Sequence, residues 1–381
     1  MSELCKTVAE MRSLSVRALA RMYLPDARMF CHCMRRGPDG DQPEGVSRRY
    51  TAIVLIGLAS EPADTGRGIC NGDDPLAVCG RLLSDVDTAE DLGDAALTLW
   101  AARLLEHPGA SKALDRLRAL DPARGPHPTV EVAWALTALS VKAEAPGDPS
   151  LAGHIARRLI RSFNHDVGVF PHWPEQVPRP FLRGHVLCFA DMVYPVQALS
   201  YYHRATGDGE ALQTAQRGGQ QMVEAQGPEG QWWWHFDART GRVVEGYPVY
   251  AVHQDSMAPM ALLALQDACG TDNSVAIERG VRWLMSSVEI GGKSLIDHDA
   301  DLIWRKVARH EPGKLVRGVQ AAVSRLHPKL RASGMDMIFR PGAIDYECRP
   351  YHLGWILHAW RSKVESRRSK VKSRGSPASD L

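Results

Sequence analysis

Three segments of the chain concentrate tryptophan, histidine and acidic side chains, which offer flat stacking surfaces and groups that transfer protons. These segments are residues 164–183, 232–255 and 297–309. An indole face can cover the apolar C–H face of a sugar ring, while flanking carboxylates accept hydrogen bonds from its hydroxyl groups. Paired acids can also act as general acid and base on a glycosidic bond. The combination indicates a carbohydrate site.

The middle segment contains the four residues that we expect to be catalytic: Asp255, His253, Glu245 and Tyr247. A carboxyl group buried in an apolar mouth has a raised pKa, so Asp255 is the candidate general acid. His253 precedes it by two residues and is placed for proton transfer or substrate binding. Glu245 and Tyr247 lie in a loop, and the alternative to a catalytic role is that they are ordinary solvent-exposed polar residues.

A second interpretation of Asp255 is structural. Asp191 and Asp255 are each followed four residues later by a proline, Pro195 and Pro259, and then by an apolar run. An acidic residue at a helix start caps free N–H groups, and proline in the first turn needs no donor. The repetition therefore also fits two helix N-caps.

We expect seven further residues to bind substrate. They are Trp173, Trp233, Trp234, His235, Arg183, Asp191 and Arg305. The alternative for the tryptophans is packing, with Trp232 closing a helical hairpin in the core and Trp233 or Trp234 capping it. Arginine suits a bidentate grip on a uronate or phosphate, which is the role considered for the cations of the third segment.

The sequence predicts no metal site and no cofactor. Alternating acids at Asp297, Asp299 and Asp301 could converge on a hard cation, but nearby basic residues favour a charge-paired segment. A zinc site would need four residues from different helices to meet, namely His185, Cys188, Cys348 and His352. Glycine-rich phosphate loops and a nucleophile-elbow motif are absent from the sequence, which argues against those nucleotide sites and hydrolases.

The segments that must position these residues are helical and come in pairs. Each pair is split by a short turn rich in Gly, Pro, Asp or Thr, such as Thr206-Gly207-Asp208 between 191–202 and 210–224. The other pairs are 49–59 with 75–84, 89–105 with 111–120, 130–142 with 151–163, and 255–268 with 274–287. A last helix at 351–360 can pair with the N-terminal helix at 8–22.

Six such hairpins predict an all-α fold, a single (α/α)6 toroid over residues 1–360. Repeat units bury their apolar faces only against neighbours, and no polar capping repeat is evident, so a closed ring fits better than an open array. Residues 291–343 form an insertion with its own charged helix, and 361–381 form a basic tail that we expect to be disordered. The long loops entering the inner helices carry nearly all the Trp, His and acidic residues, so function is expected on that rim.

Composition sets the class of protein. The chain has 381 residues, with 46 Lys and Arg against 44 Asp and Glu, a net charge of +2 that does not favour a nucleic-acid partner. Its longest apolar run, 52–59, is far too short to span a bilayer. The eight cysteines show no disulfide framework and the N-terminus has no signal core, so we expect a cytoplasmic protein with reduced thiols.

One motif resembles a known repeat. The segment 217–232, with Gln226, Gly230 and Trp232, looks like the QW repeat of squalene cyclases and prenyltransferase-repeat proteins. A weaker copy begins at Arg279-Gly280. The Asp-x-Asp-Asp acid motif of class II terpene cyclases is absent from the sequence.

A second resemblance covers most of the chain. Gly230-Gln-Trp232, then Glu245-Gly-Tyr247, then His253-Gln-Asp255 opening a helix, is similar to the layout of six-hairpin glycosidases and related lyases and epimerases. That resemblance implies a carbohydrate-active enzyme acting on an oligosaccharide or polysaccharide fragment by acid/base chemistry. The alternatives are a terpenoid-cyclase or prenyltransferase-like protein with an aromatic cavity, and a non-catalytic toroidal scaffold. For the carbohydrate-active enzyme, the expected binding partner is a small-molecule or glycan substrate.

Overall fold

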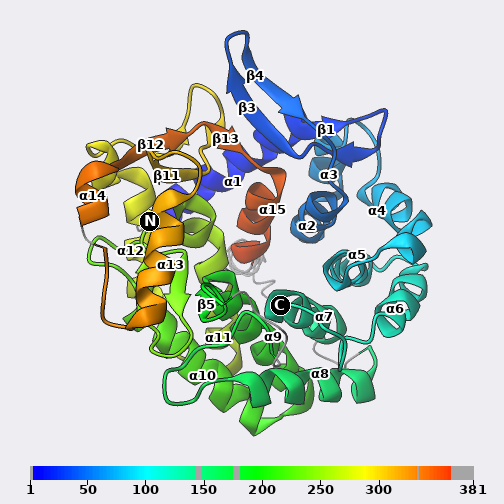
Figure 1. Cartoon of the computed structure of the whole chain (residues 1–381). Coiled ribbons are helices and arrows are strands. Elements are labelled where there is room, and N and C mark those ends of the chain that lie inside the picture. Colours follow the sequence, from blue (N-terminus) through cyan, green and yellow to red (C-terminus); the bar gives the residue numbers. More distant parts are fainter. Residues whose placement is uncertain (1–2, 143–146, 175–180, 333, 362–381) are drawn as a thin grey trace, which may run out of the picture.

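Six long inner helices form a closed ring in the computed structural model, which describes residues 3–142, 147–174, 181–332 and 334–361 (Figure 1). The inner helices are α2 (Arg48–Leu58), α5 (Leu92–Leu104), α7 (Thr129–Ser140), α9 (Ala190–Thr206), α11 (Ala258–Cys269) and α15 (Pro350–Ala359). Each packs on the next, and α15 packs extensively on α2, which closes the ring. The predicted all-α (α/α)6 toroid is therefore confirmed.

Outer helices cover this ring. They are α1 (Glu3–Met22), α4 (Pro75–Ser84), α6 (Ala110–Ala119), α8 (Pro149–Ser162), α10 (Gly209–Glu224) and α12 (Ser274–Met285), with the shorter α3 (Ala63–Ile69) beside α1. As predicted, α1 packs on α15 to complete the sixth hairpin. Burial separates the two layers: α7 buries ten of its twelve residues, whereas α6 buries two of ten. An inner helix is thus apolar all round and an outer helix only along one stripe.

The short turns end and start helices as their residues predict. Gly207 adopts φ +77°, a left-handed conformation that ends α9 at little steric cost, and the Asp208 carboxylate then accepts the Ala211 N–H to cap α10. Asp148 caps α8 in the same way through the Leu151 N–H. These caps specify the starts of α8 and α10 locally.

The proposed N-caps at Asp191 and Asp255 are wrong. Asp191 lies inside the first turn of α9 and accepts from the Cys188 N–H, which precedes the helix, while Pro195 stands within it. Asp255 lies in a single π-helical turn, η2 (His253–Met257), that leads into α11. Neither carboxylate caps a free N–H of its helix. Their repetition instead reflects two inner helices whose first turns point at the same end of the ring.

Short strands cluster at that end. They are β1 (Tyr23–Leu24), β2 (Met29–Phe30), β3 (Cys33–Gly37), β4 (Gly40–Glu44), β5 (Val186–Cys188), β6 (His235–Asp237), β7 (Val243–Glu245), β8 (Val249–Tyr250), β9 (Ile296–Asp297), β10 (Leu302–Ile303), β11 (Lys306–Arg309), β12 (Pro341–Asp345) and β13 (Glu347–Cys348). All pairings are antiparallel, in the orders β1-β2, β10-β9, β12-β11-β8, β13-β3-β4 and β5-β6-β7. They tie the loops of distant hairpins together.

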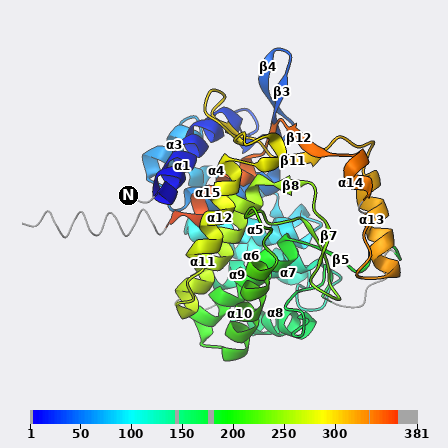
Figure 2. The same ribbon diagram turned by 90° about the vertical axis from the view of Figure 1, so that its left-hand side faces the viewer.

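Residues 291–343, expected as an insertion, form β9 to β11, the charged helix α13 (Leu315–Leu326), α14 (Gly334–Ile338) and the start of β12. Figure 2 shows α13 and α14 beside the end of the toroid, with α13 against β7. Two single 3₁₀ turns, η1 (Val86–Thr88) and η3 (Val288–Ile290), complete the elements. Of the tail predicted at 361–381, all but Arg361 lies outside the described residues. In the described chain, no helix is both long and apolar enough to span a bilayer.

Candidate functional site

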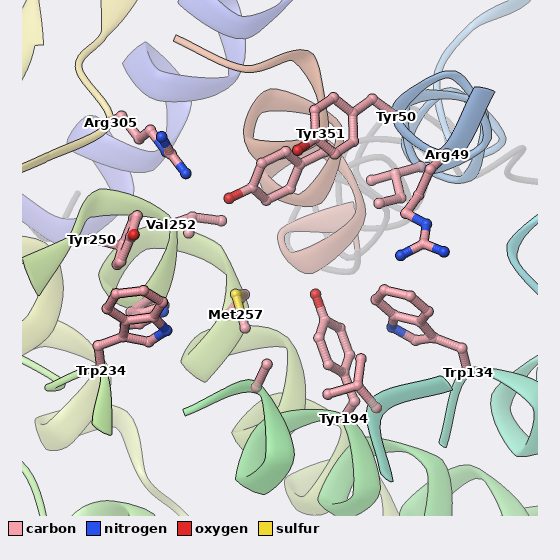
Figure 3. Close-up of a pocket in the computed structure, with 14 residues that line it drawn as sticks. Arg49, Tyr50, Trp134, Tyr194, Trp234, Tyr250, Val252, Met257, Arg305 and Tyr351 are labelled. Carbon is pink, nitrogen blue, oxygen red and sulfur yellow. The ribbon is translucent and has the colours of Figure 1, made fainter. Parts of the chain in front are cut away.

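A cavity of about 300 Å³ opens where the first turns of the inner helices converge (Figure 3). It is lined by Arg49, Tyr50, Ile53, Val130, Trp134, Ala190, Tyr194, Trp234, Tyr250, Val252, His253, Met257, Arg305 and Tyr351. These residues come from α2, α7, α9, η2, α15 and the loops between them. Its size and largely aromatic lining suit a small ligand.

Aromatic side chains form two facing walls. Figure 3 shows Trp234 and Tyr250 on one side, Trp134 on the other, and Tyr194 between them. Trp134 and Tyr194 contact each other edge to face at 5.1 Å between ring centroids, as do Trp234 and Tyr250. Such contacts hold the rings in fixed orientations. The space between the walls is therefore pre-formed.

Each wall carries one guanidinium group. Arg49 lies over the Trp134 ring at 5.6 Å, and Arg305 lies over the Tyr250 ring at 5.3 Å. Arg305 pairs with Glu347 at 3.1 Å, yet its Nε is buried without a hydrogen-bond partner. Among the described residues, no Asp or Glu lines the cavity. The lining side chains are thus aromatic and cationic, and the carboxylates that pair with Arg49 and Arg305 lie just outside the cavity.

Three acids pair with Arg49 from outside this lining: Asp91 at 2.5 Å, Asp94 at 2.8 Å and Glu131 in the first turn of α7. The least exposed of the three is Glu131. Its Oε1 lies 3.5 Å from Nη2 of Arg49, and its Oε2 accepts the Gly93 N–H at 3.2 Å. A Cβ placed on Gly93 would lie 2.9 Å from Nη2 of Arg49, 3.1 Å from Oε1 of Glu131 and 3.1 Å from the Trp134 ring. Because Gly93 has no side chain, the Glu131 carboxyl group can approach the lining residues Arg49 and Trp134 there.

Burial raises the pKa of Glu131, although the Arg49 charge lowers it in part. The carboxyl group is thereby shifted toward its protonated form, which is the form that donates a proton. Glu131 is not among the residues that the sequence analysis selected.

A second pair of cations lies behind Trp234. Arg317 of α13 is 5.0 Å from the Trp234 ring, and its Nε is buried without a hydrogen-bond partner. Burial lowers the pKa of Arg183, and the charge of Arg317 lowers it further, so the two guanidinium groups act on each other. Within the described ranges, no carboxylate forms an ion pair with either. Two like charges held together without an acid favour a bound anion.

The four residues expected to be catalytic lie in three places. His253 lines the cavity, and burial lowers its pKa to about 3, so the ring is neutral at pH 7. Asp255 is fully buried, and its Oδ2 lies 2.7 Å from Nε2 of His352. Glu245 pairs with Arg309 at 3.0 Å, and the Tyr247 hydroxyl donates to Glu289 at 2.9 Å. Of the four, only His253 is among the lining residues.

We expect Asp255→Ala to destabilise the fold. The substitution removes the acceptor of a buried hydrogen bond and leaves the His352 Nε2 unpaired, at a cost of about 1–3 kcal/mol. Urea unfolding measures this change, with Asp115→Ala as control because Asp115 is an exposed residue of helix α6 whose ion pair is with Arg118. Unchanged stability with abolished turnover would instead support the catalytic role expected from the sequence.

The residues expected to bind substrate fall into those that line the cavity, those beside it and those packed elsewhere. Trp234 and Arg305 line the cavity. His235 stacks on Trp234 at 4.0 Å between ring centroids, and Arg183 belongs to the cation pair behind it. Trp233 packs edge to face on Tyr247, Trp173 on His172, and Asp191 is fully buried. The structural alternative holds for Trp232, which is fully buried and donates its indole N–H to the Met222 carbonyl.

Sequence reasoning missed the lining residues in the first turns of the inner helices. These are Arg49, Tyr50, Trp134, Tyr194 and Tyr351. The signal was an aromatic residue near the start of an otherwise small and aliphatic inner helix. An aromatic residue at the start of a helix is equally typical of core packing, so the sequence alone does not single it out.

The acidic run of the third segment is charge-paired, as the more ordinary interpretation expected. Asp297 accepts from the Trp304 indole and contacts Arg36, while Asp301 pairs with Arg17 at 2.6 Å. The four residues considered as a joint zinc site do not meet, because His185 bonds Ser324 and His352 bonds Asp255. Within the described residues, no disulfide joins any of the eight cysteines.

Comparison with known proteins places the fold. No protein-family model and no curated protein matches this sequence. Solved structures do match over nearly the whole chain: cellobiose 2-epimerase from Spirochaeta thermophila, at 12% identity and TM-score 0.61, covers 97% of this chain and 100% of its own. This chain has the six-hairpin toroid fold.

Two further matches share that fold. An unsaturated glucuronyl hydrolase specific for heparin has 14% identity and TM-score 0.59, covering 95% of this chain and 97% of its own. The unsaturated glucuronyl hydrolase of Bacillus sp. GL1 has 14% identity and TM-score 0.57, covering 94% and 96%. The resemblance to six-hairpin glycosidase-like proteins is therefore confirmed at the level of the fold, whereas the QW-like repeat stays a prediction.

Proposed function

We propose that this protein is a carbohydrate-active enzyme of glycosidase, lyase or epimerase type, and that it binds an acidic oligosaccharide in the central cavity. The observation that carries the proposal is the cavity itself, with facing aromatic walls and a guanidinium group on each. Aromatic faces bind the C–H surfaces of sugar rings, and arginine binds carboxylate or sulfate through paired N–H groups. The fold shared with an epimerase and glucuronyl hydrolases supports it.

In this proposal Glu131 supplies the proton. Its carboxyl group lies just outside the lining residues, and burial raises its pKa, which favours the protonated form. A substrate oxygen that reaches past Arg49 takes this proton as its bond to the reacting carbon breaks. Arg49, 3.5 Å away, then stabilises the carboxylate that remains. His253, on the opposite wall beside Tyr250, is neutral and offers a ring nitrogen as hydrogen-bond acceptor to a sugar hydroxyl or water.

A ligand screen tests this function. The purified protein is mixed with acidic oligosaccharides, with neutral oligosaccharides of the same length, and with prenyl diphosphates, and thermal stabilisation and mass-spectrometric turnover are recorded. We expect stabilisation and turnover with acidic oligosaccharides. A response confined to prenyl diphosphates would favour the terpenoid alternative, and a lack of response to all three would favour the scaffold.

Arg317→Gln tests the charge preference. We expect it to weaken binding of an acidic oligosaccharide whose acidic group extends past Trp234 to Arg317 by about 10- to 100-fold, because a hydrogen bond to a charged group contributes about 1.5–3 kcal/mol. Binding of the matched neutral oligosaccharide should change little. Arg325→Gln is the control, since it makes the same charge change on α13 but contacts Phe181 instead of Trp234. Equal losses for both ligands, or for both variants, would contradict the proposal.

A further inference from the structure

Three potential metal ligands meet beside the cavity, at the start of α9. They are Nδ1 of His172, the thiol of Cys188 and the carboxylate of Asp191, and all three ligand atoms lie within 4.8 Å of one another. Each comes from a different segment: the loop after α8, the end of β5 and the first turn of α9. In the described part of the chain, no other cluster of three such residues has this spacing.

The distance between the His172 nitrogen and the Asp191 oxygens is close to that between two ligands of a tetrahedral site, and the Cys188 thiol lies within 4.8 Å of both. Nδ1 of His172 lies 3.1 and 3.2 Å from the two carboxylate oxygens of Asp191. Ligands bound to zinc at about 2.0–2.1 Å in tetrahedral geometry are separated by about 3.3 Å. A metal ion could therefore enter between these groups with only small shifts of the His172 ring, whose side chain is 44% exposed.

The surrounding structure holds the three ligands in place. The Cys188 N–H donates to Oδ2 of Asp191 at 2.7 Å, which fixes the carboxylate relative to the thiol. The Thr129 N–H donates to the His172 carbonyl at 2.9 Å and so ties the loop to the start of α7. Metal sites depend on such outer hydrogen bonds to orient their ligands.

We propose that His172, Cys188 and Asp191 form a binding site for a divalent transition metal, with zinc the best fit. A nitrogen, a sulfur and an oxygen ligand suit zinc, and hard cations such as Mg²⁺ do not favour thiolate. Binding forms one bond from each ligand to the ion and releases the Cys188 proton to solvent. Three protein ligands leave a fourth coordination position for water. One of these ligands, Asp191, lies on α9, the same helix as the lining residue Tyr194.

This site is distinct from the chemistry proposed for Glu131 and does not depend on it. It differs from the zinc site weighed in the sequence analysis, which shares only Cys188. The sequence analysis predicted no metal because His172, Cys188 and Asp191 have no recognisable ligand spacing along the chain. Cys188 and Asp191 meet because β5 leads directly into the first turn of α9, and the loop after α8 brings His172 to them.

Cobalt binding tests the proposal without any assay of activity. Metal-free protein is titrated with Co²⁺, whose bond to a thiolate gives a charge-transfer absorption in the near ultraviolet. We expect one equivalent per chain with this absorption, loss of the absorption in Cys188→Ser, and its retention in Cys269→Ser. Cys269 is a matched control because it lies partly exposed at the end of α11.

A second variant, His172→Ala, tests the site even if Cys188→Ser fails to fold. His172→Ala alters a side chain that is only half-buried, so the fold should be kept while Zn²⁺ affinity falls at least tenfold. Stabilisation by Zn²⁺ in thermal unfolding, which follows the ratio of free metal to dissociation constant, should fall in parallel. Binding of no metal, or equal binding by wild type, Cys188→Ser and His172→Ala, would overturn the proposal and indicate adventitious surface binding only.

Discussion

Glu131→Gln should lower turnover of an acidic oligosaccharide by about 10²- to 10⁴-fold, the usual contribution of a positioned general acid. The amide is close in shape and can still accept the Gly93 N–H, so the fold and the arrangement of Arg49 should be kept. Substrate affinity should change much less than the turnover number. Steady-state kinetics together with thermal unfolding would measure both effects.

The pH dependence gives a second readout of the same residue. Burial raises the pKa of Glu131, and the proposed mechanism needs its protonated form. Activity should therefore be highest below that raised pKa and should fall as the pH rises through it. Asp115→Asn is the control, because Asp115 is an exposed residue of α6 paired only with Arg118. Glu131→Gln with near wild-type turnover would rule out Glu131 as the acid.

Gly57→Ala should be among the most destabilising single substitutions in the ring. A Cβ at Gly57 of α2 would lie 2.4 Å from the carbonyl oxygen of Gly354 in α15, and one at Gly354 would lie 2.9 Å from the Ile53 carbonyl oxygen. These helices touch backbone to backbone where the last hairpin closes on the first. Because backbone cannot rotate away, we expect a loss of about 3 kcal/mol in the free energy of unfolding.

Chemical denaturation of Gly57→Ala and a control variant would test how much the contact between α2 and α15 stabilises the ring. Gly318→Ala is the matched control, since Gly318 lies in helix α13 and a Cβ there meets nothing within 4 Å. That substitution should be neutral or stabilise by up to about 1 kcal/mol, the difference in helix propensity. Equal effects at Gly57 and Gly318 would show that close packing of α2 and α15 contributes little.

The fold could be predicted because its signals are local. Each hairpin carries its own periodicity and its own turn, such as Gly207 with Asp208, and these act within a few residues. Repetition of one unit then limits the ways in which the helices can bury their apolar faces. Burial alone separates an inner helix such as α7 from an outer one such as α6.

The site was predicted only in part, because it is built from first turns that lie far apart in sequence. Trp234, His253 and Arg305 came from the dense loops and do line the cavity. Asp255 looked equally suitable, yet its side chain turns into the core and meets His352 of the last hairpin. No local pattern distinguishes a side chain that faces the cavity from one that faces the protein interior.

The amino-acid order alone was enough for the helices and their pairing, since these follow from contacts between neighbours in the chain, and the repetition of the pairs predicted the closed ring. The pairing of Glu131 with Arg49, the meeting of Arg183 with Arg317, and the gathering of His172, Cys188 and Asp191 required the three-dimensional arrangement. The reason is physical: charge interactions, ligand geometry and burial depend on distances through space, and ring closure sets those distances.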